Sequence, residues 1–124
     1  MEHATHGNLY EALALKRMRF DEKLVRTYFR QLIAGLSCLH HNGLAHMDLK
    51  PENIAFAGPD YTLKIFDYDL SLKINERTSK IGRGSENYRS PEQYLGIAKD
   101  YRACDIFAAG ILLFVMMSGG FIPF

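Results

Sequence analysis

The longest apolar stretch of the chain runs from Ile106 to Met117 and contains no charged side chain. It is shorter than the roughly 20 apolar residues that a membrane-spanning helix needs. Large side chains such as Leu112, Phe114 and Val115 lie on different sides of one helix, because about 3.6 residues make a turn. We therefore expect a helix from about residue 104 to 118 that is buried on all sides.

A second long helix is predicted over residues 21–41, where apolar side chains recur at steps of three and four. These side chains are Leu24, Val25, Tyr28, Phe29, Leu32, Ile33, Leu36 and Leu39. Asp21 can cap its first turn, and Asn-Gly at 42–43 can end it, with glycine beyond the C-cap. Shorter helices are predicted over residues 8–15 and 91–95.

Two short strands are predicted over residues 53–57 and 61–66, on either side of the Gly-Pro-Asp turn signal at 58–60. The segment just before this hairpin, residues 46–53, reads HMDLKPEN. Pro51 would interrupt a helix or a strand there, so we expect a polar loop.

Residues 71–91 show neither the helix period nor the strand period, and their charged side chains are mainly basic. Loops of this length are uncommon inside compact domains and usually have a function. We therefore expect a long, mobile loop with a functional role.

The predicted hairpin separates two acids, Asp48 and Asp67. A hairpin returns the chain close to its starting point, so both carboxylates and the amide of Asn53 should converge on one spot. Oxygen ligands of this kind suit Mg²⁺, which is bound by one or two carboxylates together with substrate phosphates. Lys50 lies in the same loop and could neutralise phosphate charge.

The composition excludes several classes of protein. The net charge is +1, so no nucleic-acid or membrane partner is expected. With 48% hydrophobic residues the chain can form a core. Cys38 and Cys104 lie in apolar segments and are expected to be buried free thiols, as in a reducing compartment. With no signal peptide at the start of the sequence, a cytoplasmic location is expected.

Five short motifs follow one another in the order found in protein kinases. His46–Asn53 resembles H-R-D-L-x-x-x-N, Asp67–Asp69 resembles D-F-G, and Ser90–Glu92 resembles A-P-E. Gly84–Tyr88 resembles the G-T-x-x-Y of serine/threonine kinases, and Asp105–Gly110 resembles D-x-W-x-x-G. The LKPEN form is similar to serine/threonine kinases, most closely to the calcium/calmodulin-dependent and AMP-activated groups.

This resemblance implies an α+β fold, mainly α: part of a kinase C-terminal lobe, with a small β-hairpin carrying the catalytic and metal loops. It also implies ATP and Mg²⁺ as cofactors and a protein substrate. Asp48 would be the base or orienter for the substrate hydroxyl, and Lys50 would stabilise the transferring phosphate. Asn53 and Asp67 would hold Mg²⁺ and, with Lys50 and Glu52, would form the cofactor-binding set.

Three positions depart from the family pattern. Met47 replaces an arginine that often pairs with a phosphorylated loop, and Asp69 replaces a glycine. Asn8 stands where kinases that prefer arginine near the target often carry glutamate, whereas the other usual acid, Glu52, is present.

The sequence contains no G-x-G-x-x-G motif and no V-A-I-K lysine. Residues 1–124 are therefore expected to be a partial kinase domain that lacks the N-terminal lobe and the later C-terminal helices.

Less specific interpretations remain open at the level of sequence. Asp48, Asn53 and Asp67 could be turn residues that cap loops. Asp105 could cap the last helix or accept backbone N–H groups from the catalytic loop. His46 is expected to be a packed, structural histidine. The other histidines are expected to be exposed and to bind no metal; they are His3, His6, His40 and His41.

Three functions fit these patterns: a kinase, a non-catalytic pseudokinase or interaction module, and an Mg²⁺-dependent phosphohydrolase. The third lacks a nucleophile or a two-metal pattern and ranks last.

Overall fold

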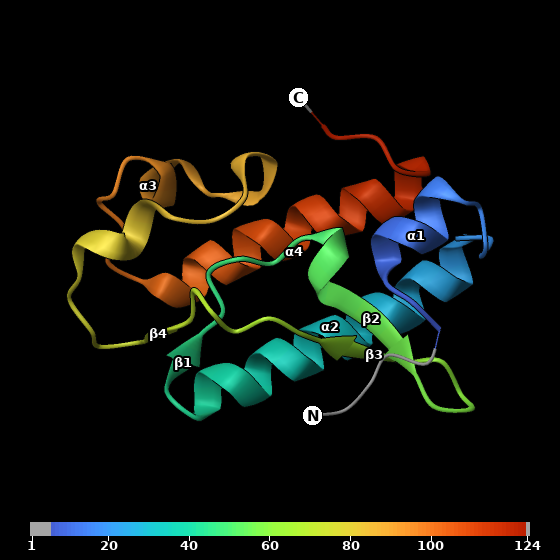
Figure 1. The fold of residues 1–124 in the computed structure, drawn as a ribbon, viewed down its shortest axis with the longest axis horizontal. Helices are drawn as coiled ribbons and strands as arrows, with labels where there is room; N and C mark the ends of the chain where they lie inside the picture. Colours follow the sequence, from blue (N-terminus) through green and yellow to red (C-terminus); the bar gives the residue numbers. More distant parts are fainter. Residues whose placement is uncertain (1–5, 124) are drawn as a thin grey trace.

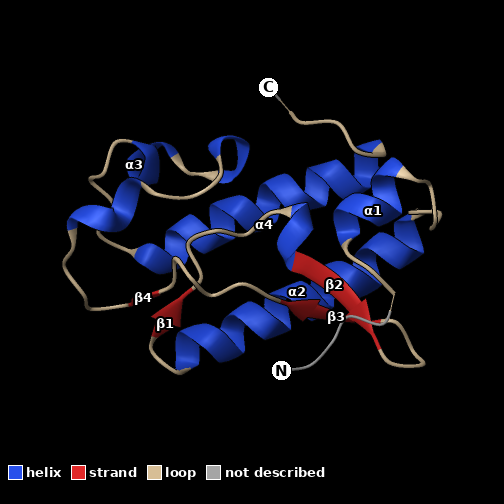
Figure 2. Cartoon of the chain, viewed as in Figure 1, coloured by secondary structure: helices blue, strands red, loops and turns tan. Residues whose placement is uncertain are grey.

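The computed structural model describes residues 6–123. Two long helices, α2 (Glu22–His41) and α4 (Tyr101–Ser118), lie side by side and run in opposite directions (Figure 1). Helix α1 (Leu9–Ala14) lies near the end of α4, whereas α3 (Pro91–Tyr94) lies near its start. The arrangement is mainly helical, with little strand (Figure 2).

Two small antiparallel sheets complete the fold. Strands β2 (Ile54–Ala57) and β3 (Thr62–Ile65) form the predicted hairpin, with Ile54 opposite Ile65. Strands β1 (Leu44–Ala45) and β4 (Leu72–Lys73) form a second pair. This second pair was not predicted, because two residues are too few to show an alternating pattern.

The helix ends follow the predicted caps, with one correction. Asn8 and Glu11 form a capping box at α1, and Asp21 Oδ1 accepts a hydrogen bond of 2.9 Å from Leu24 N at α2. Helix α4 begins at Tyr101, earlier than predicted, because Asp100 Oδ1 accepts from Arg102 N at 3.1 Å. The first turn of α4, residues 101–104, includes the charged Arg102 and precedes the apolar run, so the run alone did not show it.

The segment 71–91 is more regular than predicted. Besides β4, it contains two 3₁₀ helices, Ser79–Gly82 and Glu86–Tyr88. Its backbone contacts distant parts of the chain: Ile74 N donates to Gly43 O at 2.8 Å. Contacts over such sequence distances are invisible to a periodicity search.

The core lies between α2, α4 and the hairpin, where Leu32, Phe56 and Leu112 are almost fully buried. The expectation that α4 is buried on all sides is wrong for the described residues. Large apolar side chains along one face of α4 are exposed: Ile106 by 51%, Phe114 by 45% and Met117 by 65%. No described segment packs over these three side chains.

Of the described helices, α4 is the one that is long and apolar enough to cross a membrane by length and composition. Half of that stretch is buried inside the protein, where α4 packs against α2. Core helices of soluble proteins pass the same test, so this match is weak evidence for a membrane span.

We expect residues 1–124, prepared alone, to self-associate through the exposed face of α4. Each large side chain left in water forgoes about 1.5–3 kcal/mol of burial free energy, and contiguous apolar surface promotes association. Phe114→Lys and Met117→Lys should shift the size-exclusion profile toward monomer. Leu15→Lys at the C-cap of α1, which removes another exposed apolar side chain, serves as the control. A clean monomer at every concentration would contradict this expectation.

Candidate active site

The carboxylate of Asp48 lies at the centre of the loop that follows β1. Ser85 Oγ donates a hydrogen bond of 2.9 Å to Asp48 Oδ1. Lys50 Nζ lies 3.7 Å from Asp48 Oδ2, and the Asp48 side chain is only 10% exposed. The two oxygens of Asp48 therefore face a hydroxyl and an ammonium group.

Asn53 closes this loop from the side of the hairpin. Its side chain is almost fully buried, and its Nδ2 donates to Asp48 O at 2.8 Å. Asn53 N also donates to Lys50 O at 3.0 Å, in the short 3₁₀ helix Pro51–Asn53. Pro51 suits the first position of this turn because it lacks an N–H that would need a partner.

Asp67 is brought to the same end of the hairpin as Asn53. Phe66 N donates to Asn53 O at 2.8 Å, and Asp67 is the next residue after Phe66. The side chain of Asp67 is exposed, and its Oδ1 accepts from Asp69 N at 3.3 Å. The predicted convergence of Asn53 and Asp67 is therefore present in the backbone geometry.

A cavity of about 840 Å³ adjoins this end of the hairpin, and its lining includes Phe66, Asp67, Tyr68 and Asp69. Its volume is within the usual range for small-molecule sites. No cluster of three acidic, histidine or cysteine side chains suited to a metal occurs among the described residues. Asp48, Asp67 and Asp69 therefore do not form a three-carboxylate cage.

Glu52 is exposed on the 3₁₀ helix Pro51–Asn53. It lies close enough to Tyr88 to influence that residue's ionisation: burial raises the pKa of Tyr88 to about 12, and the Glu52 carboxylate adds to this shift. Tyr88 is therefore a neutral phenol at physiological pH. Glu52 thus presents its charge on the side of the loop that faces the segment 71–91.

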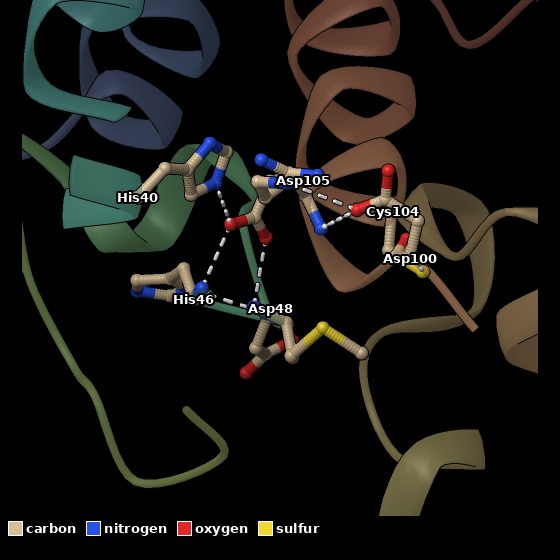
Figure 3. A network of polar contacts seen from close by, with 8 residues as sticks. His40, His46, Asp48, Asp100, Cys104 and Asp105 are labelled. Carbon is tan, nitrogen blue, oxygen red and sulfur yellow. Dashed lines mark hydrogen bonds and ion pairs between the residues drawn. The ribbon is translucent and has the colours of Figure 1, made fainter. Parts of the chain in front are cut away.

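Asp105, buried within the first turns of α4, accepts hydrogen bonds from the backbone of the Asp48 loop (Figure 3). Its Oδ2 accepts from His46 N at 2.8 Å, and its Oδ1 accepts from Met47 N at 2.9 Å. His40 Nε2 donates to Oδ2 at 2.8 Å. Of the two roles left open for Asp105, the structure shows the loop acceptor, and Asp100 takes the cap.

His40 is a functional neighbour that the sequence reasoning missed, since exposure was expected. Its side chain is only 13% exposed and is paired with Asp105. A signal was available: Tyr28, Leu32 and Leu36 are buried on α2 at steps of four, and His40 continues that series. A polar residue on a buried helix face needs a partner.

The ring of His46 is fully buried, as predicted for a packed, structural histidine. Its Nδ1 accepts from Asp48 N at 3.1 Å, so its Nε2 carries the hydrogen and donates to Phe66 O at 2.8 Å. The His46 ring also packs against the Tyr68 ring, with 5.2 Å between the ring centroids. This histidine therefore links the Asp48 loop to the Asp67 segment.

The remaining histidine and cysteine predictions have mixed outcomes. His41 is exposed as expected. His6 is half-buried, and its ring stacks on the Tyr61 ring with 3.6 Å between the ring centroids. His3 lies outside the described residues. Cys104 is buried as predicted, and burial raises the pKa of its thiol, whereas Cys38 is exposed. The prediction for Cys38 was wrong because that position lines the open cavity next to Phe66, Asp67 and Asp69.

Met47 is buried in a second apolar cluster, which joins the Asp48 loop to the segment 71–91. The cluster consists of Ala45, Met47, Leu72, Ile81, Ala98, Tyr101 and Cys104. An arginine at position 47 would place a charge among these side chains, at a high cost in desolvation. Apolar packing therefore contributes to holding Ile81 and its segment in place.

The profile of the protein kinase domain matches residues 1–124. The chain belongs to the protein kinase family. This assignment confirms the resemblance drawn from the motifs and the kinase-like, mainly helical fold class.

Among the curated relatives of this kinase chain are serine/threonine kinases. It is 35% identical to the serine/threonine-protein kinase kin-29 of Caenorhabditis elegans over 124 residues, covering 99% of this chain and 15% of that protein. It is also 35% identical to the CBL-interacting serine/threonine-protein kinase 24 of Arabidopsis thaliana, covering 28% of that protein. The chain thus spans less than a third of the length of each of these relatives.

A solved kinase structure shares the fold. A chain in the crystal structure of the yeast RNA Pol II CTD kinase CTDK-1 complex superposes with a TM-score of 0.80 at 30% identity. The match covers 91% of this chain and 37% of that chain. The kinase fold is therefore supported by the sequence profile and by the backbone.

Proposed function

We propose that residues 1–124 belong to the catalytic core of an ATP-dependent protein serine/threonine kinase. Such an enzyme transfers the γ-phosphate of ATP to a serine or threonine hydroxyl of a protein substrate. The main support is the setting of Asp48, whose carboxylate oxygens lie 2.9 Å from Ser85 Oγ and 3.7 Å from Lys50 Nζ. An anchored carboxylate beside a lysine is suited to orienting a hydroxyl next to a phosphate.

In this proposal Asp48 orients the substrate hydroxyl and accepts its proton as the bond to phosphorus forms. Lys50 neutralises charge on the phosphoryl group during its transfer. The backbone of Asp48 is fixed on both sides, since its N–H donates to His46 Nδ1 and its C=O accepts from Asn53 Nδ2. Most of the catalytic effect in phosphoryl transfer comes from positioning and electrostatic stabilisation.

The side chains at the hairpin end fit a magnesium–nucleotide complex. Asn53 uses its Nδ2 as a donor to Asp48 O, so its amide oxygen is the atom suited to a cation. Asp67 supplies an exposed carboxylate nearby, and Mg²⁺ prefers one or two carboxylates plus phosphate oxygens. When bound, the ion neutralises phosphate charge. We place Glu52 on the nucleotide and substrate side of the same loop.

A non-catalytic pseudokinase is the second candidate, favoured by Met47 and Asp69 at positions where the family usually has arginine and glycine. The backbone weakens the objection at position 69. Among the described residues, Met47 and Asp67 have positive φ values of 71° and 60°, whereas Asp69 does not. The conformational freedom of glycine is therefore not required at Asp69.

The function is tested on the full-length protein with magnesium, labelled ATP and a library of serine- and threonine-containing peptides. A kinase incorporates label into the peptides, whereas a pseudokinase binds ATP without transfer. Release of phosphate that does not depend on peptide would favour the phosphohydrolase. Either of the last two results would overturn the proposal.

We expect Asp67 rather than Asp69 to be the main metal ligand. Mutation of a residue that only hydrogen-bonds a metal ligand typically lowers metal affinity by about 10–100-fold. Asp67 is proposed to be a ligand itself, so Asp67→Asn should weaken magnesium-dependent nucleotide binding by at least that factor. Asp69→Gly should have a smaller effect. Nucleotide binding is measured by calorimetry with and without magnesium on the full-length protein. A larger loss in Asp69→Gly would reverse the assignment.

A further inference from the structure

The peptide group at Met47, directly before Asp48, has an uncommon conformation that is held from both sides. Its φ of 71° lies in the left-handed region, which residues with a side chain rarely adopt. Such a conformation persists where surrounding contacts fix it. Met47 N donates to Asp105 Oδ1 at 2.9 Å, and Met47 O accepts from Gln93 Nε2 at 2.9 Å.

Gln93 donates to two separate segments. Its side chain is 98% buried in α3, and the two hydrogens on Nε2 serve Met47 O at 2.9 Å and Arg83 O at 2.7 Å. Ser90 Oγ accepts from Gln93 N at 3.2 Å and fixes the backbone of Gln93 itself. The Gln93 amide therefore bridges the Asp48 loop and the segment 71–91, while the backbone of Gln93 is held in place within α3.

The two carbonyls that Gln93 bridges lie close in sequence to the pair Asp48 and Ser85. Met47 precedes Asp48, and Gly84 alone separates Arg83 from Ser85. A Cβ atom at Gly84 would lie 2.9 Å from both Gln93 Nε2 and Met47 O. Glycine at position 84 thus permits the approach that brings Ser85 Oγ to 2.9 Å from Asp48 Oδ1.

We propose that Gln93 is a positioning residue that couples the segment 71–91 to the catalytic loop and thereby sets the orientation of Asp48. It acts through the carbonyls of Met47 and Arg83 and does not touch the substrate. The proposal rests on the kinase function proposed above. If the bridge is broken, the Ser85–Asp48 contact is held less firmly, because the apolar cluster of Met47 and Ile81 restrains the two segments without the hydrogen bonds to Met47 O and Arg83 O.

The test variant is Gln93→Met, which keeps a side chain of similar length but removes both donors. Space for a water molecule is absent among the surrounding residues, so water cannot replace the amide. Tyr28→Phe is the matched control, since it removes the side-chain donor that Tyr28 directs to a backbone carbonyl, Tyr61 O at 2.9 Å. Tyr61 lies next to the turn between β2 and β3, at the end of the hairpin away from Asn53 and Asp67.

In the full-length kinase, Gln93→Met should lower kcat by about ten- to a hundredfold, the range expected from small misplacement of a catalytic group. KM for ATP should change by less than about twofold, because the contacts that bind ATP equally in the ground state and the transition state are not altered. Tyr28→Phe should change neither constant by more than about twofold. A rise in KM with kcat unchanged, or equal effects in both variants, would overturn the proposal.

A double-mutant cycle tests the route of the effect. If Gln93 acts through the Ser85–Asp48 contact, then Gln93→Met combined with Ser85→Ala should lower kcat little more than the stronger single variant. Fully additive losses would show that Gln93 acts by another route and would contradict the inference.

Amide hydrogen exchange separates this inference from the proposed kinase function. In Gln93→Met, but not in Tyr28→Phe, the amides of Met47 and Asp48 should exchange faster, even if the protein transfers no phosphate. Their N–H groups are bonded to Asp105 and to His46 in the native loop. Unchanged exchange at these two amides would refute the bridge whatever the activity.

Discussion

Asp48→Asn in the full-length protein should lower kcat for phosphate transfer by about 10²–10⁴-fold, the usual contribution of a general base. Asparagine has nearly the same shape but cannot accept a proton or carry the charge that faces Lys50 at 3.7 Å. The affinity for ATP should change little, because Asp48 is not among the proposed nucleotide ligands.

The matched control for this prediction is Asp60→Asn, in the exposed turn between β2 and β3. It makes the same chemical change away from the proposed site and should leave kcat within about twofold of the unaltered protein, as a surface substitution should. Thermal melting of both variants checks that the fold is retained. If Asp48→Asn kept more than about a tenth of the activity, a role of this size for Asp48 would be excluded.

Asp105→Ala should be the most destabilising single change, lowering the free energy of unfolding by roughly 3–5 kcal/mol. Asp105 is 1% exposed and accepts hydrogen bonds from His46 N, Met47 N and His40 Nε2. Alanine would leave all three donors buried without a partner. Such a loss is a large share of the ~5–15 kcal/mol that stabilises a typical domain.

Asp100→Ala provides the comparison, since both acids lie near the start of α4. Asp100 is an exposed N-cap, and its loss should cost about 1 kcal/mol. Urea denaturation of the full-length protein, followed by far-UV circular dichroism, measures both changes. Equal losses in the two variants would show that the buried contacts of Asp105 contribute no more than an exposed cap.

The helices and the hairpin were predictable because their signals are local. Asp21 caps α2 four residues before the first buried side chain, Val25, and the Gly-Pro-Asp turn separates two apolar strands. The pair β1–β4 was not predictable, because it joins residues 44–45 to 72–73 through backbone hydrogen bonds that leave no pattern in the side chains.

The candidate site was predictable in its members but not in its supports. The motifs name Asp48, Lys50, Asn53 and Asp67, and the hairpin places Asn53 and Asp67 at one end. The contacts of His40 and Gln93 join residues far apart in the sequence, at separations of 65 and 46 positions. The buried series on α2 indicates that His40 needs a polar partner, but nothing near His40 or Gln93 in the sequence identifies that partner.

By itself, the sequence determined the family, the principal helices and the polar loop around Asp48. These depend on residue type, spacing and the conformational limits of proline and glycine, which act over a few neighbouring positions. Only the tertiary structure decided which face of α4 stays exposed, that Asp105 holds the catalytic loop, and that Gln93 bridges to the segment 71–91. These features depend on which distant groups meet when the chain closes, because a buried polar group needs a partner wherever the fold provides one.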